Sequence, residues 1–477
     1  MTTVGRIRRP GPPRFCMQLS PRLALGRRFA LAFFFSSAAA LLAGPWEPLF
    51  NGKDLTGWKP LGGRAPYAVV DGAVVGTTVV GEPNSFLATE KPYGDFILEL
   101  EVKQDGIPSN SGIQFRSVSD PAVMDGRVHG YQFELDPSDR GWTGGIYDEA
   151  RKGWLYPGTL NPAAKSAYQY GRWNRVRVEA IGPSLRTWVN GVPVAHVVDA
   201  QTAAGFIALQ VHSVNGPAQA GGRIHWRNLR IQTTDLIPSP EEPIFVRSTL
   251  VNELAPIEQA QGWKLLWDGR TTSGWRGARK DAFPTGGWQI KDGELVVQES
   301  GGGESRAGGD IVTQAEYATF ELQLEFKLSA GANSGIKYFV QEDLTPIGGS
   351  AMGLEFQLLD DAAHPDAKAG AAGNRTLGSL YDLIPREALP GGLNIAPRIG
   401  EWQHARIVVH PDQRVEHWLN GIKVVDYRRG SPLFRALVAR SKYAETAGFG
   451  EAPQGRILLQ DHGNQVHFRS IKIRPLK

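Results

Sequence analysis

Polar and apolar residues alternate along two neighbouring segments of the chain, residues 109–116 and 130–136. Ile113 and Phe115 fall on one face of the first segment, and a matching apolar face runs along the second. A period of two is typical of β-strands with one buried face and one open face. We therefore expect two adjacent strands whose open face forms a candidate site, with amide, guanidinium and carboxylate groups at Gln114, Arg116, Gln132, Glu134 and Asp136.

The same pattern occurs a second time, at residues 332–338 and 353–360. In this second copy Glu355 precedes Gln357, which reverses the amide-then-acid order of the first copy. The two copies are too far apart to be successive units of a solenoid, whose repeats are about 20–50 residues long. The pattern therefore predicts a duplicated domain.

Short strand-like segments bounded by turn signals recur through both copies. Residues 96–102 and 320–326 alternate cleanly, and the Asn-Gly pairs at residues 190–191 and 420–421 mark tight hairpin turns. The 57 glycines, 32 prolines and 13 tryptophans suit a turn-rich β protein better than a helical one. The sequence predicts an all-β fold of two tandem β-sandwiches of jelly-roll type.

A stretch rich in proline separates the two copies. We expect the domains to span residues 44–234 and 262–477, and residues 235–261 to join them as a semi-rigid linker with a short helix near its end. Three prolines stiffen the first part of this linker: Pro238, Pro240 and Pro243.

Residues 1–43 have the character of a signal peptide, which predicts an exported, periplasmic or secreted protein. They contain seven arginines and no acidic residue, and they end in an apolar run, residues 29–43, that is rich in small side chains. This run is shorter than the roughly 20 residues that span a membrane, so an uncleaved anchor is the less favoured alternative. The pair Arg27-Arg28 leaves both the Sec and the twin-arginine routes open.

Removal of this segment changes the electrostatic picture. The formal net charge of +4 becomes slightly negative, because all seven of those arginines are lost. A nucleic-acid partner is therefore not expected, and no membrane span is expected in the mature chain. The single cysteine, Cys16, is also lost, which leaves no disulfide or thiol chemistry.

Five motifs occur in the same order in each half: an opening such as Leu49–Trp58, the Asn-Ser-Gly-Ile strand, the acid/amide strand, a Trp…Asn-Gly hairpin, and a close such as Gln460–Gly463. Together they resemble the 3-keto-disaccharide hydrolase family over nearly all of the mature chain. This resemblance implies a concanavalin A-like jelly roll, export, and cleavage of di- or oligosaccharides or other glycosides already oxidised at C3.

The first half departs from the family pattern in two places. Gln132 and Glu134 reverse the acid/amide order, and Val211-His212-Ser213 replaces Asp-His-Gly. Two catalytic subtypes, or one active and one binding domain, are therefore both open. The alternative for the whole chain is a lectin-like protein that binds glycans without cleaving them, since a fold alone implies neither function.

A ketone at C3 acidifies the proton on C2, so a base can remove that proton and the C1 substituent can leave by elimination. Water then adds to the resulting glycal, which completes a net hydrolysis. This chemistry needs a base near the working pH, an acid for the leaving oxygen, and positive charge at the enediolate. We expect His462 or His212 as base or acid, Glu355 or Glu134 as base, Lys337 or Arg116 at the enediolate, and Tyr381 or Tyr147 as proton donor.

Other polar and aromatic residues near these positions are expected to bind the sugar. They alternate with the catalytic candidates or follow tyrosine in a glycine-rich loop: Gln357, Asp360, Asp382, Gln132, Asp136, Asp148, and, for stacking on a sugar ring, Trp142 and Trp154. The structural alternatives are a solvated sheet face, a surface histidine, a guanidinium paired with a neighbouring acid, and a turn capped by an aspartate.

No cofactor follows from the spacing of these residues, and a divalent metal stays open. Hard oxygen ligands with an imidazole would suit Ca, Mn or Zn. The two candidate sets are Glu134, Asp136 and His212, and Glu355, Asp360 and His462.

Overall fold

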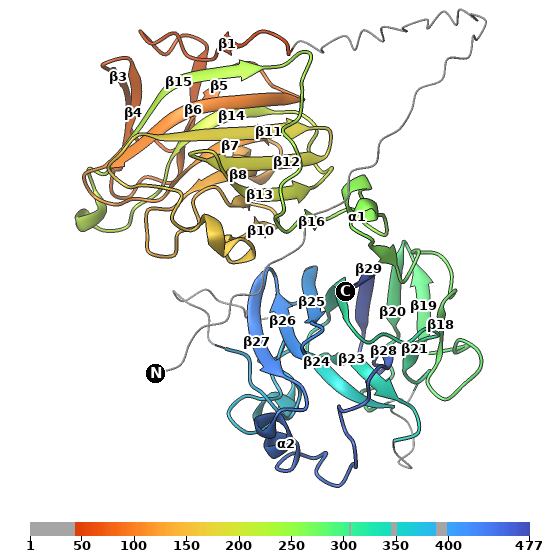
Figure 1. Ribbon diagram of the computed structural model, residues 1–477. Helices are drawn as coiled ribbons and strands as arrows, with labels where there is room; N and C mark the ends of the chain where they lie inside the picture. Colours follow the sequence, from red (N-terminus) through yellow and green to blue (C-terminus); the bar gives the residue numbers. More distant parts are fainter. Residues whose placement is uncertain (1–42, 305–306, 345–350, 388–397) are drawn as a thin grey trace, which may run out of the picture. The chain divides into compact units, whose positions relative to one another are not determined.

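The computed structural model describes residues 43–304, 307–344, 351–387 and 398–477. The predicted signal peptide therefore lies almost wholly outside the described residues. Strands dominate each half, and the α-helices of the described residues are the short α1 (Pro256–Ala260) and α2 (Pro432–Val438). The prediction of an all-β fold with tandem sandwiches is confirmed (Figure 1). None of the described helices combines the length and the apolar character that a membrane span needs.

The first sandwich consists of two sheets whose neighbouring strands are antiparallel, apart from the parallel pair β16 and β13. One has the order β16–β13–β12–β11–β6–β15–β4–β3 with β1 beside β15, and the other has the order β10–β9–β8–β7–β14–β5–β2. Strands of the first sheet are β1 (Glu47–Pro48), β3 (Tyr67–Val70), β4 (Ala73–Thr77), β6 (Phe96–Asp105), β11 (Asn174–Ile181), β12 (Ser184–Val189), β13 (Val192–Val198), β15 (Arg223–Gln232) and β16 (Arg247–Ser248). Strands of the other sheet are β2 (Trp58–Gly62), β5 (Ser85–Thr89), β7 (Ser111–Val118), β8 (His129–Leu135), β9 (Ile146–Glu149), β10 (Gly153–Tyr156) and β14 (Phe206–Val211).

The second sandwich repeats this plan. Its larger sheet has the order β19–β20–β29–β22–β25–β26–β27 with β17 beside β29, and its smaller sheet has the order β18–β21–β28–β23–β24. The larger sheet contains β17 (Lys264–Leu265), β19 (Trp288–Lys291), β20 (Glu294–Val297), β22 (Phe320–Leu328), β25 (Gln403–Val409), β26 (Arg414–Leu419), β27 (Ile422–Arg428) and β29 (Val466–Pro475). The smaller sheet contains β18 (Trp275–Gly277), β21 (Ile311–Thr313), β23 (Asn333–Gln341), β24 (Met352–Leu359) and β28 (Arg456–Leu459).

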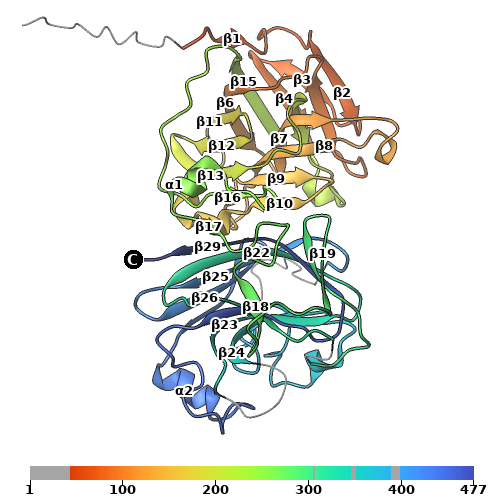
Figure 2. The same ribbon diagram turned by 90° about the vertical axis from the view of Figure 1, so that its right-hand side faces the viewer.

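The alternation seen in the sequence sets which side chains enter each core. Ile113 and Phe115 on β7 and Phe133 on β8 are fully buried between the two sheets of the first sandwich. Ile336 on β23 and Phe356 on β24 are fully buried in the second core. Helix α2 lies at one end of the second sandwich (Figure 2). Its Phe434 ring stacks on Tyr427 of β27, with ring centroids 5.8 Å apart.

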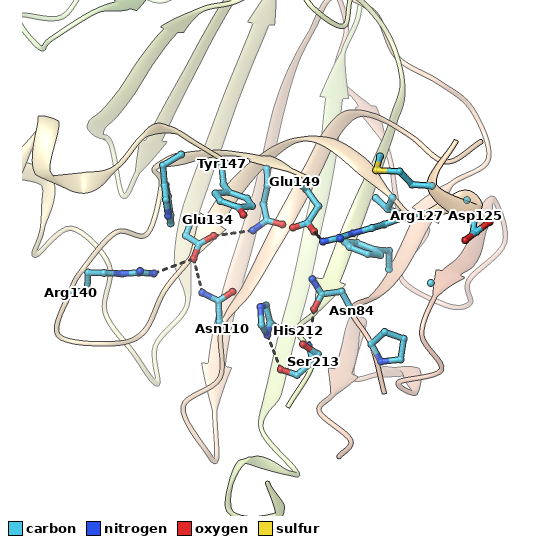
Figure 3. Close-up of a pocket in the computed structure, with 18 residues that line it drawn as sticks. Asn84, Asn110, Asp125, Arg127, Glu134, Arg140, Tyr147, Glu149, His212 and Ser213 are labelled. Carbon is cyan, nitrogen blue, oxygen red and sulfur yellow. Dashed lines mark hydrogen bonds and ion pairs between the residues drawn. The ribbon is translucent and has the colours of Figure 1, made fainter. Parts of the chain in front are cut away.

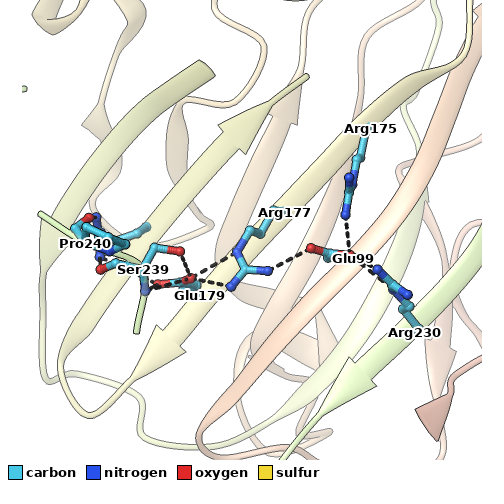
Figure 4. Close-up of polar contacts among 8 residues, drawn as sticks. Glu99, Arg175, Arg177, Glu179, Arg230, Ser239 and Pro240 are labelled. Atoms are coloured by element: carbon cyan, nitrogen blue, oxygen red, sulfur yellow. Dashed lines mark hydrogen bonds and ion pairs between the residues drawn. The ribbon is translucent and has the colours of Figure 1, made fainter. Parts of the chain in front are cut away.

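The linker binds the outer face of the first sandwich (Figure 4). The backbone N–H of Ser239 donates to the Glu179 carboxylate at 3.1 Å, and Arg186 donates to the Ser239 and Pro240 carbonyls at 2.6 and 2.5 Å. Strand β16 then pairs with β13 in parallel. Glu179 also pairs with Arg177, in a row of charges that continues to Glu99, so the first part of the linker is held on this sandwich.

Candidate active sites

The polar face of β8, together with Asn110 just before β7, lines a cavity of about 930 Å³ in the first sandwich (Figure 3). The equivalent face of β23 and β24 lines a cavity of about 350 Å³ in the second sandwich. Strand pairing explains why these faces match. Gln114 lies opposite Gln132 on β7 and β8, and Lys337 lies opposite Glu355 on β23 and β24.

A buried carboxyl group stands at the centre of the second cavity. Only 4% of Glu355 is exposed, and burial raises the pKa of its carboxyl to about 7, although the charges of Lys337 and Lys442 act in the opposite direction. When the Gln357 amide is oriented so that its nitrogen faces acceptors, it donates to Glu355 Oε1 at 3.2 Å and to the Ser334 carbonyl at 3.0 Å. A carboxyl group that titrates near neutral pH is suited to acid–base chemistry.

The glycine of the Asn-Ser-Gly motif makes room for this carboxyl. A Cβ atom at Gly335 would lie 2.0 Å from Glu355 Oε1, which is far inside van der Waals contact. In the first sandwich, a Cβ at Gly112 would lie 2.4 Å from the Gln132 side chain. The motif is thus explained by the close approach of a polar side chain across the neighbouring strand.

Two loops complete the second cavity. The Tyr381 hydroxyl donates to Asp366 Oδ2 at 2.9 Å, and Lys442 Nζ lies 4.2 Å from the centre of the Tyr381 ring. Burial lowers the pKa of Lys442 and raises the pKa of Tyr381. Both side chains line the cavity beside Glu355.

A pair of histidines lies across the same cavity. The rings of His462 and His364 meet edge to face, with centroids 5.8 Å apart. Within the described part of the chain, the buried Nδ1 atom of His462 has no hydrogen-bond partner. Burial and the neighbouring His462 lower the pKa of His364.

The sequence predictions for the second half are thus partly matched by position. The structure brings together Glu355, Gln357, Tyr381 and His462 at the cavity. Lys337 lies next to them, but it is only 6% exposed and forms an ion pair with Glu304 at 3.7 Å. It therefore acts on Glu355 from below the cavity surface.

Asp360 and Asp382 were expected at the substrate, and the structure contradicts this expectation. Asp360 accepts the backbone N–H groups of Gly331 at 2.8 Å and Ala362 at 3.1 Å, so it stabilises turns. Asp382 accepts from Arg375 Nε and from the backbone N–H of Lys442, each at 2.8 Å. Its role is to position the loop that carries Lys442.

Sequence reasoning missed several residues of this cavity. Asn333 and Gln460 belong to motifs recognised in the sequence, but the other four come from loops without strand periodicity, and no local pattern marks them. They are Glu304, Asn333, His364, Asp366, Lys442 and Gln460.

In the first sandwich, amide groups surround the buried carboxyl (Figure 3). Glu134 accepts from Asn110 Nδ2 at 2.6 Å and from Gln132 Nε2 at 2.9 Å, and Gln114 Nε2 donates to Gln132 Oε1 at 2.6 Å. Burial raises the pKa of Glu134 to about 7, while the two amide donors act to lower it. His212 also lines this cavity, and its Nδ1 lies 2.7 Å from the Ser213 carbonyl.

Tyr147 and Trp154 line the first cavity as expected, whereas Trp142 does not. Trp142 is only 4% exposed and meets Trp154 edge to face with ring centroids 4.7 Å apart. The expectation that Trp142 stacks on a sugar is therefore wrong, because its ring is used to support Trp154.

Arg116 was expected on the open face, and this too is wrong. Its backbone adopts a φ of +45° at a bulge in β7, and the side chain is 1% exposed. The guanidinium donates to the carbonyls of Gly94 at 2.8 Å and Gly182 at 2.7 Å and pairs with Asp95. Arg116 therefore joins loops of the sandwich and does not reach the cavity.

Asp136 and Asp148 likewise pair with neighbouring arginines and do not line the cavity. Asp136 accepts from Arg140 Nε at 2.7 Å, and Asp148 accepts from Arg151 Nε at 2.8 Å. The two candidate metal sets include Asp136 and Asp360, whose carboxylates already accept hydrogen bonds from Arg140 and from the backbone N–H of Gly331. Across residues 43–304, 307–344, 351–387 and 398–477, no group of three or more His, Cys, Asp or Glu side chains converges on a metal position.

Comparison with known proteins agrees with the sequence resemblance. A family model described as a 3-keto-alpha-glucoside-1,2-lyase-like domain matches residues 45–232 and again 262–474. A curated protein of Bacteroides thetaiotaomicron, named 3-keto-disaccharide hydrolase, is 38% identical over 244 residues, which cover 46% of this chain and 80% of that protein.

Solved structures from Parabacteroides distasonis also match. One candidate glycosyl hydrolase is 30% identical with a TM-score of 0.41 and covers 48% of this chain and all of its own. A second candidate glycosyl hydrolase is 25% identical with a TM-score of 0.32, and the match covers 45% of this chain and 99% of its own. The family match and the curated relative make the protein a carbohydrate-active enzyme of hydrolase type. With one matching region in each sandwich, the chain belongs to the 3-keto-alpha-glucoside-1,2-lyase-like domain family.

Proposed function

We propose that the second sandwich cleaves glycosides that carry a ketone at C3, by proton abstraction at C2, elimination at C1 and addition of water. The observation that carries this proposal is the buried Glu355 carboxyl, whose pKa is raised to about 7 at a cavity lined by a lysine, a tyrosine and a histidine. The name of the curated relative supports the class of substrate.

Each step has a suitable group in the cavity. Glu355 as carboxylate removes the C2 proton, and the electron pair of that C–H bond forms the enediolate with the C3 ketone. Lys442 lines the cavity as a cation and stabilises the charge on the enediolate oxygen. Lys337, buried beside Glu355, helps to keep the base ionised.

Elimination follows when the enediolate collapses and the C1–O bond breaks. His462 protonates the leaving oxygen, and the product is a 2-hydroxy-3-keto-glycal. Water then adds across C1 and C2 of this glycal with His462 as base, and C2 regains a proton from Glu355. The two groups thus return to their starting states, and the net reaction consumes one water molecule.

Turnover of 3-keto-trehalose by the purified mature chain tests the proposal. Removal of a general acid or base typically costs ~10²–10⁴ in rate, so we expect Glu355→Gln and His462→Ala each to lower kcat by at least about a hundredfold. A correctly folded parent chain that turns over no 3-keto sugar would leave the lectin-like alternative as the better account.

A further inference from the structure

We propose that the first sandwich carries a saccharide-binding site that takes a neutral glycan and does not cleave it. This inference extends the proposed function, which it assumes only for the second sandwich. The cavity of about 930 Å³ lies near the upper end of the roughly 300–1,000 Å³ range of small-molecule sites. It is also much larger than the cavity of about 350 Å³ in the second sandwich.

The first cavity lacks the cationic arrangement that the elimination needs. Gln114 occupies the position on β7 that Lys337 occupies on β23. The cross-strand partner of Gln132 is therefore a neutral amide, whereas the cross-strand partner of Glu355 is a lysine. The lining contains no lysine among the described residues, and its cations are Arg127 and Arg140. A developing enediolate would find little free positive charge here.

Both arginines are already committed to carboxylates. Arg127 pairs with Glu149 at 3.0 Å, and Arg140 pairs with Asp136 at 2.7 Å while its guanidinium lies 4.2 Å from the centre of the Trp142 ring. Neither an anionic ligand nor an anionic transition state is therefore favoured by excess charge. A neutral ligand fits this balance of charges.

The polar groups of the cavity include both hydrogen-bond donors and hydrogen-bond acceptors. The Asn110 amide nitrogen donates to Glu134, which leaves its oxygen as an acceptor. Asn84 Oδ1 accepts the Ser213 N–H, which leaves its amide nitrogen as a donor. Because a carbonyl only accepts, the 2.7 Å contact to Ser213 requires His212 Nδ1 to donate, and in the neutral ring Nε2 is then an acceptor. Sugar hydroxyls both donate and accept, and they match such a mixed set.

An aromatic platform stands beside these polar groups. Trp154 lines the cavity, and its ring is held edge to face by Trp142 at 4.7 Å and by Tyr147 at 5.1 Å between centroids. A ring fixed in this way offers a rigid surface at little entropic cost to the C–H face of a pyranose. Met124, which is 47% exposed, adds an apolar edge at the same cavity.

Calorimetric titration of the purified mature chain with trehalose, maltotriose and cellotriose tests the site directly. None of these sugars carries a ring ketone, so binding is measured apart from turnover. We expect at least one of them to bind with one site per chain, and Trp154→Ala or Glu134→Ala to weaken that binding at least about tenfold. Glu355→Gln should leave the affinity unchanged.

A matched control is available in the same sandwich. Trp173 lies under Arg227, whose guanidinium is 3.9 Å from the ring centre, and it does not line the cavity. Trp173→Ala should bind saccharide like the parent chain, which separates loss of the site from loss of folding. Absence of binding by all three sugars, or binding that survives both Trp154→Ala and Glu134→Ala, would overturn the proposal.

The non-catalytic character is tested in a chain whose second site is disabled by Glu355→Gln and Lys442→Met. We expect the residual turnover of 3-keto-trehalose to stay the same when Glu134→Gln is added. A further fall of tenfold or more would show that the first site is catalytic and would overturn the inference. If the parent chain never turns over a 3-keto sugar, the proposed function fails, whereas the titration still decides the binding site.

Discussion

Replacing Lys337 with glutamine, the residue found at the equivalent position 114, should move the pH profile of the enzyme upward. Burial raises the pKa of Glu355 to about 7, and the charge of Lys337 prevents a larger rise. Without that charge the carboxyl should take up its proton at higher pH. The base would then be present in a smaller fraction of molecules at neutral pH.

The size of this effect follows from the strand register. Lys337 and Glu355 are direct partners on β23 and β24, and the Cβ atoms at such positions are about 5 Å apart, which sets the scale for the separation of the two charges. Two unit charges at that distance interact by about 3 kcal/mol at an effective dielectric constant of about 20, which corresponds to about two pKa units. Because Lys442 remains, we expect the pKa of Glu355 to rise by about one to two units.

The measurement is kcat/KM for 3-keto-trehalose between pH 5 and pH 10 at constant ionic strength. A catalytic base must be ionised, so kcat/KM should rise with pH through the pKa of Glu355. At pH 7 an upward shift of about one unit lowers the ionised fraction from about one half to about one tenth. The Lys337→Gln variant should therefore lose about fivefold or more at pH 7 and recover most of this loss near pH 9.

Lys327→Met is the matched control, because Lys327 pairs with Glu294 at 3.4 Å outside the cavity lining. It should keep the parent profile. An unchanged midpoint in Lys337→Gln would refute the reasoning, because it would show that the titrating base is not Glu355. A loss of activity that is equal at every pH would also contradict it.

Three further predictions concern stability, processing and domain independence. Because the pKa values of Glu134 and Glu355 in the folded chain lie above the ordinary value of 4.5, the folded state binds more protons than the unfolded state between pH 4.5 and 7. The free energy of unfolding should therefore fall as pH rises through this window, by up to about 3 kcal/mol per group. Urea unfolding of Glu134→Gln should show a shallower fall with pH. A fall equal to that of the parent chain would count against the buried-carboxyl account. N-terminal sequencing of exported protein should find a start between Leu41 and Glu47, whereas an intact Met1 would contradict cleavage of a signal peptide. Separation of the chain at Val251 should give two fragments that each unfold cooperatively, and insolubility of the second fragment alone would contradict independent folding.

Much of the fold could be predicted because strand periodicity is a local property. Alternation along β7, β8, β23 and β24 placed Gln132, Glu134, Glu355 and Gln357 on open faces, and each of these residues lines its cavity. The same alternation placed Ile113 and its neighbours in the core. The duplication and the family resemblance followed from the same short motifs, which strand pairing and close approach of side chains explain.

Departures from regular backbone geometry decided what the periodicity could not show. The period-two pattern predicts Arg116 on the open face, but the bulge, where its φ is +45°, redirects the side chain to loop carbonyls. In the sequence Asp360 resembles a site residue because it directly follows β24, and Asp382 because it directly follows Tyr381. Their actual partners are backbone N–H groups and an arginine that only the folded loops bring near.

The sequence by itself determined which residues share a sheet face, including Glu134 and Glu355, because this depends on residues two or four positions apart, and the repeated motifs determined the duplicated plan. Only the tertiary structure brought Lys442 to the second cavity from a loop far from β24 in the chain, and folded His364 back from the loop that directly follows β24. The burial that raises the pKa of Glu355 is likewise a property of the closed cavity and not of the strand. Loop closure over large sequence separations obeys no short period, and so the chemistry of the site was decided by packing.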